Sequence, residues 1–260
     1  MTVRDALREA ELRLAAAGVD TPRVDAELLL AHVAGTTRSG LYADLDRELD
    51  GELEPLLARR EAREPLAYVL GEWGFRRLTL KTDARALVPR PETEVVVERC
   101  LSLLAGTTEP RILDIGVGSG AIALSLKSER PDADVVGVDV SPGALALARE
   151  NAARLGIDVE LREGGAAAAA AGWDLVVSNP PYVDSLDGLQ PELRYEPEEA
   201  LIGAGLHEEI ARAAVTRFLV FEVGAGQAHE VADVLRACGY DDVTVTADLA
   251  GHDRVVEGRR

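Results

Sequence analysis

The sequence runs Arg111-Ile-Leu-Asp114-Ile-Gly116-Val-Gly118-Ser-Gly120 where an apolar strand gives way to a helix that begins at Ala121. Glycines allow the backbone to approach a ligand closely, and the helix N-terminus presents N–H groups that have no partner within the helix. The spacing is G-x-G-x-G, which differs from the G-x-G-x-x-G of dinucleotide-binding proteins. We therefore expect a ligand-binding loop at the carboxyl end of a buried strand.

Apolar, strand-like segments recur along the chain around this loop, and helical segments separate the first six of them. Buried strands that alternate with amphipathic helices indicate a mainly parallel sheet covered on both faces. The predicted strands are Arg111–Ile115, Val135–Val140, Val159–Leu161, Asp174–Ser178, Phe218–Val223, Val243–Ala247 and Arg254–Glu257. Only a few residues around Gly251 join the last two, so these should form an antiparallel hairpin. The pattern predicts an α/β fold, a Rossmann-like seven-stranded sheet with an antiparallel last strand.

The region before this sheet is predicted to be helical. Helical periodicity is found in Val3–Leu14, from Pro22 to Gly35, and in Leu49–Leu57, with Thr21 as the expected N-cap of the second helix. Alternating apolar residues between Trp73 and Val88 predict a hairpin or a pair of short strands. We expect a helical substrate-docking domain at residues 1–72, a β-hairpin linker at 73–90 and the α/β domain at 91–260.

Two segments of the α/β region are irregular. Residues Gly164–Gly172 contain six consecutive alanines and predict a short helix or a loop without chemistry of its own. The join between a helix ending near Val215 and a strand starting near Phe218 is very short, which leaves open whether a segment near residues 203–217 is missing.

The charge of the chain restricts its partners. Its 28 Lys and Arg side chains and 46 Asp and Glu side chains give a net charge of -18. Residues 1–80 hold 11 basic and 15 acidic side chains, a net charge of -4, so the remaining -14 lies in residues 81–260. Nucleic acid is bound mainly by cations that displace phosphate counterions. We therefore expect a protein or small-molecule partner and no nucleic acid.

The sequence suggests neither a membrane protein nor a metalloprotein. No apolar run reaches about 18 residues, and the N-terminus is too charged for a signal peptide, so we expect a cytoplasmic protein without a membrane partner. Cys100 and Cys238 are the only cysteines, and the four histidines are scattered. These residues provide no disulfide framework and no metal site.

Asp139 is the second candidate ligand residue. It ends the strand that follows the glycine-rich loop and lies 19 residues after Gly120. A carboxylate at this place can accept hydrogen bonds from both hydroxyls of a ribose. The loop and Asp139 together predict a nucleoside site, and the pair fits S-adenosylmethionine better than NAD.

The third candidate is Asn179-Pro180-Pro181-Tyr182, which follows the predicted strand Asp174–Ser178 and should face the same ligand. Proline fixes φ and has no N–H, so the turn is stiff and the Pro180 carbonyl can point outward. With the side-chain oxygen of Asn179, this carbonyl offers two acceptors to a planar NH2 group, and Tyr182 supplies an aromatic wall. The motif predicts methylation of such a nitrogen without a general base.

Four motifs together resemble the PrmC/HemK family of protein-(glutamine-N5) methyltransferases, which are class I S-adenosylmethionine-dependent enzymes. They are Glu64-Pro-Leu-Ala-Tyr68-Val-Leu-Gly71, Leu87-Val-Pro-Arg90-Pro-Glu92-Thr93-Glu94, Asn179-Pro-Pro-Tyr182 and Glu222-Val-Gly224-Ala-Gly-Gln227. The resemblance covers nearly the whole chain. It implies methylation of the glutamine in the Gly-Gly-Gln motif of peptide chain release factors 1 and 2, with the helical module helping to dock the factor.

The resemblance also implies roles for individual residues. Asn179, Pro180 and Tyr182 would be catalytic, and these three with Pro181 would hold the substrate amide. The cofactor-binding residues would be Gly116, Val117, Gly118, Ser119 and Gly120 at the methionine part, Asp139 at the ribose, Glu163 and Gly164 at the adenine, and Asn179. At positions 163 and 164 the family usually has an Asp followed by a large residue, and the loop that follows Glu196-Pro197, with Ala200-Leu-Ile-Gly203-Ala-Gly205, is shorter here.

Other readings remain open at this stage. The nearest is methylation of a ribosomal-protein glutamine, which shares the Asn-Pro-Pro-Tyr motif and the two-domain layout. Adenine-N6 methylation of DNA shares the motif, but the net charge of -18 and the lack of a basic stripe disfavour it. A non-catalytic S-adenosylmethionine sensor would fit better if Asn179 or Tyr182 were replaced. Arg90 and Glu92 are candidates either for the floor of the amide pocket or for a structural ion pair.

Overall fold

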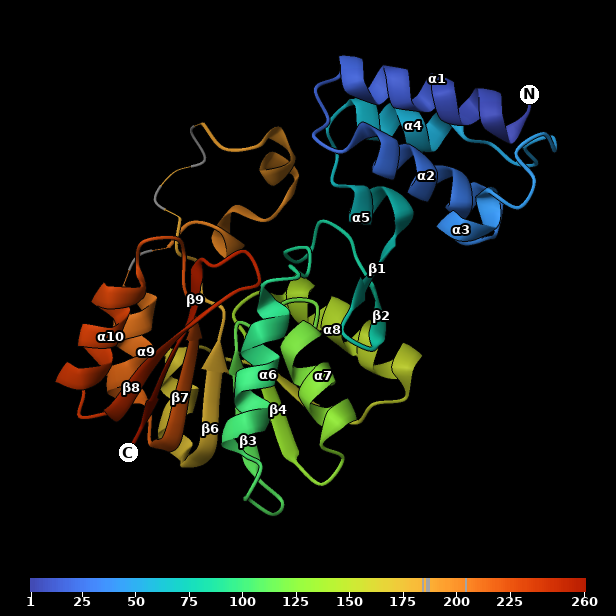
Figure 1. The fold of residues 1–260 in the computed structure, drawn as a ribbon. Coiled ribbons are helices and arrows are strands. Elements are labelled where there is room, and N and C mark those ends of the chain that lie inside the picture. The colour runs from blue at the N-terminus through green and yellow to red at the C-terminus, as the bar shows by residue number, and fades with distance from the viewer. Residues whose placement is uncertain (184, 186–187, 204) are drawn as a thin grey trace. The chain divides into compact units, whose positions relative to one another are not determined.

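The computed structural model describes residues 1–183, 185, 188–203 and 205–260. The chain forms two compact units. The helical unit comprises Met1–Glu72 together with Leu189–Tyr195, and the α/β unit comprises Trp73–Gly188 and Glu196–Arg260 (Figure 1). By sequence position Leu189–Tyr195 lies within the predicted domain 91–260, but in the structure it groups with the helices. Ala204 of the shortened loop lies outside the described residues.

The helical unit is built on a leucine-rich core. Its helices are α1 Val3–Ala16, α2 Pro22–Val33, α3 Arg38–Leu41, α4 Glu54–Glu61 and α5 Leu66–Leu70. Leu14, Leu29 and Leu30 are fully buried in this core, and Leu57 is nearly so. One sequence prediction here is wrong. The helix expected from Leu49 begins at Glu54, because Gly51 has a φ of 117° that no helix contains. Thr21 occupies the N-cap position of α2 as expected, but its hydroxyl donates to the Asp25 carboxylate at 2.8 Å and makes no cap hydrogen bond with the backbone.

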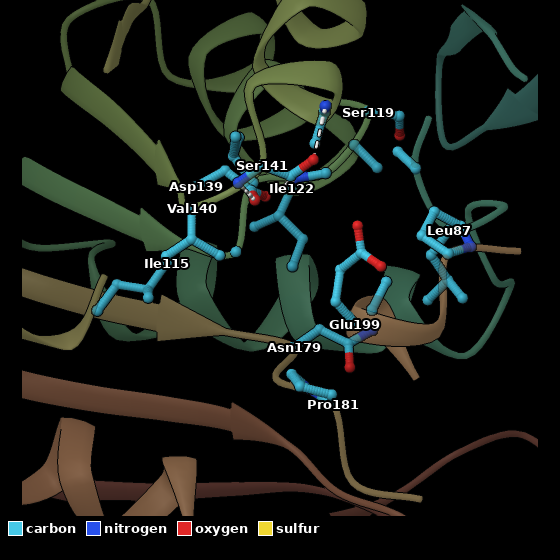
Figure 2. Close-up of a pocket in the computed structure, with 18 of the residues that line it drawn as sticks. Leu87, Ile115, Ser119, Ile122, Asp139, Val140, Ser141, Asn179, Pro181 and Glu199 are labelled. Carbon is cyan, nitrogen blue, oxygen red and sulfur yellow. Dashed lines mark hydrogen bonds between the residues drawn. The ribbon is translucent and has the colours of Figure 1, made fainter. Parts of the chain in front are cut away.

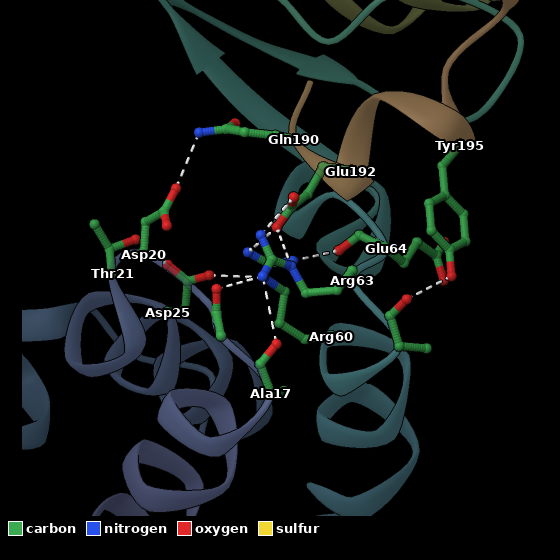
Figure 3. Close-up of polar contacts among 12 residues, drawn as sticks. Ala17, Asp20, Thr21, Asp25, Arg60, Arg63, Glu64, Gln190, Glu192 and Tyr195 are labelled. Carbon is green, nitrogen blue, oxygen red and sulfur yellow. Dashed lines mark hydrogen bonds and ion pairs between the residues drawn. The ribbon is translucent and has the colours of Figure 1, made fainter. Parts of the chain in front are cut away.

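A cluster of ion pairs holds Leu189–Tyr195 within the helical unit (Figure 3). Glu192 accepts hydrogen bonds from Arg60 at 2.8 Å and from Arg63 at 2.7 Å. Arg60 is 6% exposed and also donates to Asp25 at 2.7 Å. The Tyr195 hydroxyl donates to the carbonyl of Ala62 at 2.6 Å. Buried charges persist in proteins when they are paired in this way, so Glu192 fixes the segment to the helices.

A two-stranded sheet follows the helices, as the alternation between Trp73 and Val88 predicted. Its strands are β1 Glu72–Phe75 and β2 Leu78–Lys81. The Asn151 side chain accepts from the Lys81 N–H at 2.7 Å and donates to the Lys81 carbonyl at 3.1 Å. This pair of hydrogen bonds joins β2 to the helix that contains Asn151.

The large sheet confirms the predicted fold class. Its strands are β3 Arg111–Ile115, β4 Asp134–Asp139, β5 Glu160–Glu163, β6 Trp173–Ser178, β7 Thr216–Glu222, β8 Asp241–Ala247 and β9 Asp253–Arg259. They lie in the order β5-β4-β3-β6-β7-β9-β8. Pairing is parallel from β5 to β7, while β9 is antiparallel to both of its neighbours. The last two strands therefore form the expected antiparallel pair, with β9 inside the sheet and β8 at its edge.

Helices cover both faces of this sheet because successive side chains of a buried strand point to opposite faces. The helices of the unit are α6 Thr93–Leu103, α7 Ala121–Glu129, α8 Pro142–Leu155, α9 Leu206–Ala213 and α10 Ala228–Ala237. Ile112 of β3 packs in the cluster that contains α6, α7 and α8 residues, whereas Leu113 packs with α9 and α10. Figure 1 shows α6 and α7 lying across one face of β3 and β4.

The two irregular segments have simple structures. Ala166–Ala171 forms the 3-10 helix η1, in which Ala166 and Ala169 are buried. Only Ala214 and Val215 separate α9 from β7. The Val215 carbonyl accepts from the Trp173 N–H at 2.9 Å, and its own N–H donates to Ala169 at 2.9 Å. The two-residue join is thus held by backbone hydrogen bonds to β6 and η1.

Strand register brings the three candidate motifs to one edge of the sheet. Ile115, at the end of β3, lies opposite Val138 of β4 and Ser178 of β6. The glycine-rich loop, Asp139 and Asn179 follow directly after these three neighbouring strands. They therefore share the carboxyl edge, where open α/β sheets bind ligands.

Candidate active site

A cavity opens at the carboxyl edge of the sheet within the α/β unit (Figure 2). Its walls come from six segments of the chain. The lining residues are Arg85–Arg90 and Thr93, Ile115–Ser119 with Ala121 and Ile122, Asp139–Ser141 with Ala144, Gly164–Ala166, and Asn179, Pro181, Pro197, Glu199, Ala200 and Leu206. Figure 2 shows Asn179 and Pro181 on one side of the cavity and Asp139 and Ser141 on another.

The glycine-rich loop has a backbone that other residues rarely adopt. Gly116, Gly118 and Gly120 have φ values of 76°, 55° and 90°, all in the left-handed region. A β-carbon on Gly116 would lie 4.0 Å from the backbone oxygen of Asn179, so the loop runs close to the Asn-Pro-Pro-Tyr turn. A β-carbon on Gly120 would lie 2.8 Å from the Leu124 side chain. Gly120 is thus required for the start of α7, while Gly116 and Gly118 face the cavity.

Asp139 joins the loops that follow β3 and β4. Its Oδ2 accepts from the Gly118 N–H at 2.9 Å, and its Oδ1 accepts from the Ser141 N–H at 2.9 Å. Ser141 in turn caps α8 by accepting from the Ala144 N–H. Each carboxylate oxygen can accept a second hydrogen bond, so Asp139 keeps acceptor capacity toward the cavity.

Asp114 is a buried carboxyl beneath the glycine-rich loop, 1% exposed. Its Oδ2 accepts from the Ala123 N–H at 3.0 Å, whereas its Oδ1 has no hydrogen-bond partner among the residues that the structure describes. Burial raises the pKa of Asp114 to about 7, with a smaller increase from the charge of Asp139 and an opposing effect of the Ala123 hydrogen bond. Asp114 therefore titrates near neutral pH.

Asn179 is half-buried and is held from behind. The Ser178 hydroxyl donates to the Ile115 carbonyl at 2.7 Å and so ties the end of β6 to β3. Nδ2 of Asn179 donates to the Thr93 hydroxyl oxygen at 3.4 Å, and the Thr93 hydroxyl donates to Glu222 at 2.6 Å. The Asn179 side chain thus turns its amide nitrogen toward Thr93.

The rest of the turn is fixed by two close glycine contacts. A β-carbon on Gly203 would lie 2.7 Å from Pro181, and one on Gly224 would lie 2.8 Å from the Tyr182 ring. The Gln227 amide donates to the Tyr182 carbonyl at 3.0 Å. Burial, and secondarily the charge of Glu222, raises the pKa of Tyr182 above its ordinary value. Tyr182 is therefore a neutral, well-packed ring at physiological pH.

The structure brings most of the predicted site residues together. Gly116, Val117, Gly118, Ser119, Asp139, Gly164, Asn179 and Pro181 all line the cavity. Within the described part of the chain, Gly120, Glu163, Pro180 and Tyr182 do not line it. Glu163 is exposed, while its neighbour Gly164 donates to the Asp139 carbonyl at 3.1 Å. Beside Gly164, the cavity is lined by the small or apolar residues Val140, Ala144, Gly165 and Ala166.

The sequence prediction missed the wall formed by residues 85–93. Its only signal was the Leu87–Glu94 motif, to which no chemistry had been assigned apart from the two alternatives for Arg90 and Glu92. In the structure Arg90 lines the cavity, and its guanidinium donates to the Glu196 carboxylate, which is the ion pair of the second alternative. Glu196 is 5% exposed and also accepts from the Val88 N–H at 2.9 Å. This buried carboxylate fixes the wall.

No group of three or more His, Cys, Asp or Glu side chains that could hold a metal ion occurs among residues 1–183, 185, 188–203 and 205–260. Over the same ranges, no helix has the length and apolar character needed to cross a membrane.

Two family profiles match the chain. The profile of the PrmC N-terminal domain matches residues 5–71, and that of the methyltransferase small domain matches residues 94–193. Among solved structures, the catalytic domain of hMettl16 bound to a MAT2A 3′UTR hairpin aligns with a TM-score of 0.57 at 15% identity, over 83% of this chain and 84% of that chain. At this identity the likeness shows the fold alone, that of the class I methyltransferases.

Curated relatives match over their whole length. A release factor glutamine methyltransferase of Deinococcus radiodurans is 42% identical, covering 100% of this chain and 99% of its own. Those of Vibrio cholerae and Caulobacter vibrioides are each 40% identical, covering 100% and 99% of this chain and 97% and 96% of their own. The glycine-rich loop, Asp139 and Asn179 around one cavity agree with this match. The chain therefore belongs to the release factor glutamine methyltransferase family.

Proposed function

We propose that this protein transfers a methyl group from S-adenosylmethionine to the side-chain amide nitrogen (N5) of the glutamine in the Gly-Gly-Gln motif of peptide chain release factors 1 and 2, in the cytoplasm. One observation carries the proposal: the amide-holding Asn179 lines the same cavity as the glycine-rich loop and Asp139. A nucleoside-type ligand and a planar amide could therefore meet in this cavity. The names of the full-length relatives supply the acceptor.

The residues present fit S-adenosylmethionine. Gly116 and Gly118 have no β-carbon, so the methionine part of the cofactor can approach the backbone closely at both residues. Asp139 can accept from the ribose hydroxyls through its remaining lone pairs. Val140 and the small residues Gly164 and Gly165 line the cavity near Asp139 and leave room for the adenine. We therefore assign the cofactor contacts to these residues and omit Glu163, whose side chain is exposed.

The chain's own groups position the substrate nitrogen. The Asn179 side-chain oxygen and the Pro180 carbonyl each accept one of the two N–H groups of the glutamine amide, which fixes its plane and direction. Tyr182 packs beside the turn and limits movement of the amide. Bound S-adenosylmethionine would supply an electrophilic methyl group, which would leave its sulfur for the amide nitrogen that Asn179 and Pro180 hold. The methylated nitrogen is strongly acidic and loses a proton to water, so no side chain needs to act as a general base.

Methyl transfer to competing acceptors tests the proposal. Wild-type protein should label release factor in preference to ribosomal protein and DNA when labelled S-adenosylmethionine is supplied with all three. Asn179→Ala should abolish transfer while S-adenosylmethionine affinity, measured by calorimetry, stays within about twofold, because only the substrate loses a hydrogen bond acceptor. Preferential labelling of ribosomal protein or DNA would contradict the acceptor assignment. Full activity of Asn179→Ala would contradict the role of Asn179.

A further inference from the structure

Thr93 and Glu222 form a buried hydrogen-bonded pair directly behind Asn179. Thr93 begins α6 and Glu222 ends β7, and their side chains are 4% and 1% exposed. The Thr93 hydroxyl donates to Glu222 Oε2 at 2.6 Å, and Asn179 Nδ2 donates to Thr93 Oγ1 at 3.4 Å. The second distance is long, as is common for catalytic hydrogen bonds before substrate binds. The three residues form one chain of hydrogen bonds that ends at the cavity.

The number of hydrogen atoms available to these three side chains determines which of them donates in each hydrogen bond. An ionised carboxylate only accepts hydrogen bonds, and a threonine hydroxyl has a single proton to donate. When the Thr93 hydroxyl donates its hydrogen bond to Glu222, the Thr93 oxygen can only accept a further hydrogen bond. The NH2 end of Asn179 is then the end that can face Thr93, so the carbonyl end of the same amide must face the cavity. A substrate amide brings N–H donors and needs an acceptor there.

We propose that Glu222 is a positioning residue which, acting through Thr93, holds the Asn179 side chain with its oxygen toward the substrate amide. The inference deepens the proposed function and rests on it, since the substrate is taken to be a planar amide. Without the carboxylate, Asn179 could rotate by half a turn and present its own N–H groups to those of the substrate. Two donors cannot bond each other, so that orientation is unproductive.

The loop that follows Glu222 supports the other end of the same turn. Gln227 donates its side-chain amide to the Tyr182 carbonyl at 3.0 Å and accepts from the Gly224 N–H at 3.1 Å. Gly224 lies against the Tyr182 ring, where any β-carbon would be 2.8 Å from it. Residues 222–227 therefore contact both Tyr182 and, through Thr93, Asn179. The segment acts as a support for the substrate turn.

The charge state of Glu222 should control this support. The groups that act on it are Thr93, which donates to its carboxylate, and the charged Arg254, Glu92 and Arg90. His207 donates to the main-chain carbonyl of Glu222, is kept neutral by burial, and lies edge-on against Phe221. Burial raises the pKa of Glu222 to about 7, against the lowering effects of Thr93, Arg254 and Arg90. A protonated Glu222 can itself donate to Thr93. The direction of the hydrogen bonds from Asn179 through Thr93 to Glu222 is then no longer fixed.

Substitutions at Thr93 and Glu222 test the positioning role in methyl transfer. Thr93→Val has nearly the same shape but no hydroxyl, and should lower kcat/KM for the release factor on the order of 10- to 100-fold without changing S-adenosylmethionine affinity. Thr93→Ser, which keeps the hydroxyl, should restore most of this loss. Thr244→Val, the same change at an exposed position on β8, is the matched control and should have no effect.

The pH profile separates positioning from packing. In the wild type, kcat/KM at saturating S-adenosylmethionine should fall as the pH decreases through about 7, because Glu222 becomes protonated. Glu222→Gln cannot ionise and should have a lower, pH-independent rate over this range. If Thr93→Val or Glu222→Gln kept the wild-type rate and the wild-type pH profile, the positioning role would be overturned.

A measurement without substrate keeps this test independent of the proposed function. Asn151 and Asn179 are the only asparagines in the sequence, so side-chain 15N labelling of asparagine gives two NH2 signal pairs. The Asn179 pair should shift with a midpoint near pH 7 in the wild type, and Thr93→Val and Glu222→Gln should each abolish the shift. Asn151, which is fully buried and donates to Lys81 and Ser119, is the internal reference.

The two measurements fail in different ways. If the wild type labels no release factor but the Asn179 signals behave as described, the proposed substrate is wrong and the hydrogen-bonded chain is real. If the wild type labels release factor while the Asn179 signals change neither with pH nor on Thr93→Val substitution, the substrate assignment is supported and the inference about Glu222 is overturned.

Discussion

The Asp139 side chain fixes two loops of the cavity and can also bind a ligand there. Its two carboxylate oxygens already bind the N–H groups of Gly118 and Ser141, which lie on the loops after β3 and β4. A ligand ribose would use the second acceptor position of each oxygen. The residue therefore shapes the loops whether or not a ligand is bound, and its contribution to binding must be separated from its contribution to shape.

Replacement of Asp139 should weaken cofactor binding. Asp139→Ala removes the acceptors for the ribose and should raise the Kd for S-adenosylmethionine by about 10-fold or more, since hydrogen bonds to charged groups contribute about 1.5–3 kcal/mol. Asp139→Asn keeps one acceptor oxygen and should lose less. Asp134→Ala, at the exposed opposite end of the same strand, is the control. An unchanged Kd for Asp139→Ala in calorimetry would argue against the ribose role.

Among single residues, the sequence predicted those whose position depends only on the strand that precedes or contains them. Gly116, Gly118 and Asn179 follow predicted strands and Asp139 lies at the end of one, so parallel pairing brings them to one edge without further information. The partnership of Thr93 with Glu222 could not be predicted in this way. These residues lie 129 positions apart and meet only because α6 packs on the sheet near β7.

At the scale of elements, the strands were predictable and some helix boundaries were not. The parallel strands β3, β4, β6 and β7 are nearly continuous apolar runs because they are buried on both faces, which is why they were found within a few residues of their true ends. Strands β5 and β8 are mostly exposed, so this reason does not apply to them. The helix expected over Leu49–Leu57 failed at Gly51, which has a φ of 117° and where a β-carbon would lie 2.7 Å from the Val33 side chain. The grouping of Leu189–Tyr195 with the helices depends on side-chain pairs that no periodicity reveals.

Glu192 should control the attachment of that segment. Glu192→Ala leaves Arg60 and Arg63 without their shared partner and should lower the free energy of unfolding of the helical unit by about 3 kcal/mol. It should also speed trypsin cleavage after the exposed Arg194. Glu198→Ala, a change of the same kind at an exposed residue, is the control. Equal cleavage rates in wild type and Glu192→Ala would contradict this account.

At the scale of the whole molecule, the net charge of -18 disfavours DNA as a substrate relative to a protein. Residues 81–260, which contain the cavity, have a net charge of -14. A net charge of this sign repels a DNA duplex, more strongly as the salt concentration is lowered. A loop of a protein substrate needs only to enter the cavity with one amide.

Folding stability should fall as the pH rises from about 5 to 8. Burial raises the pKa of Asp114 and of Glu222 to about 7 in the folded state, above the ordinary values of 3.8 and 4.5. The folded state then binds more protons than the unfolded state within this window, so the stability contributed by both groups is present below pH 4 and is lost as the pH passes 7. Each contributes up to about 1.4 kcal/mol per pH unit.

Urea denaturation at pH 5.5 and pH 8 measures this effect. Glu222→Gln and Asp114→Asn should each reduce the difference between the two pH values. Carboxylates such as Glu150, whose pKa Arg85 and Lys81 lower to about 2, should destabilise the protein only below about pH 4.5 and leave this window unaffected. Higher stability at pH 8 than at pH 5.5 would show that the two buried carboxyls do not have the pKa values described.

A comparison of two substrates tests whether the methylated residue is the glutamine of the Gly-Gly-Gln motif. Purified protein is incubated with labelled S-adenosylmethionine and either intact release factor or the same factor with that glutamine replaced by alanine. We expect about one labelled methyl group per intact factor, on the glutamine side chain, and none on the substituted factor. Equal labelling of the two factors would contradict this expectation.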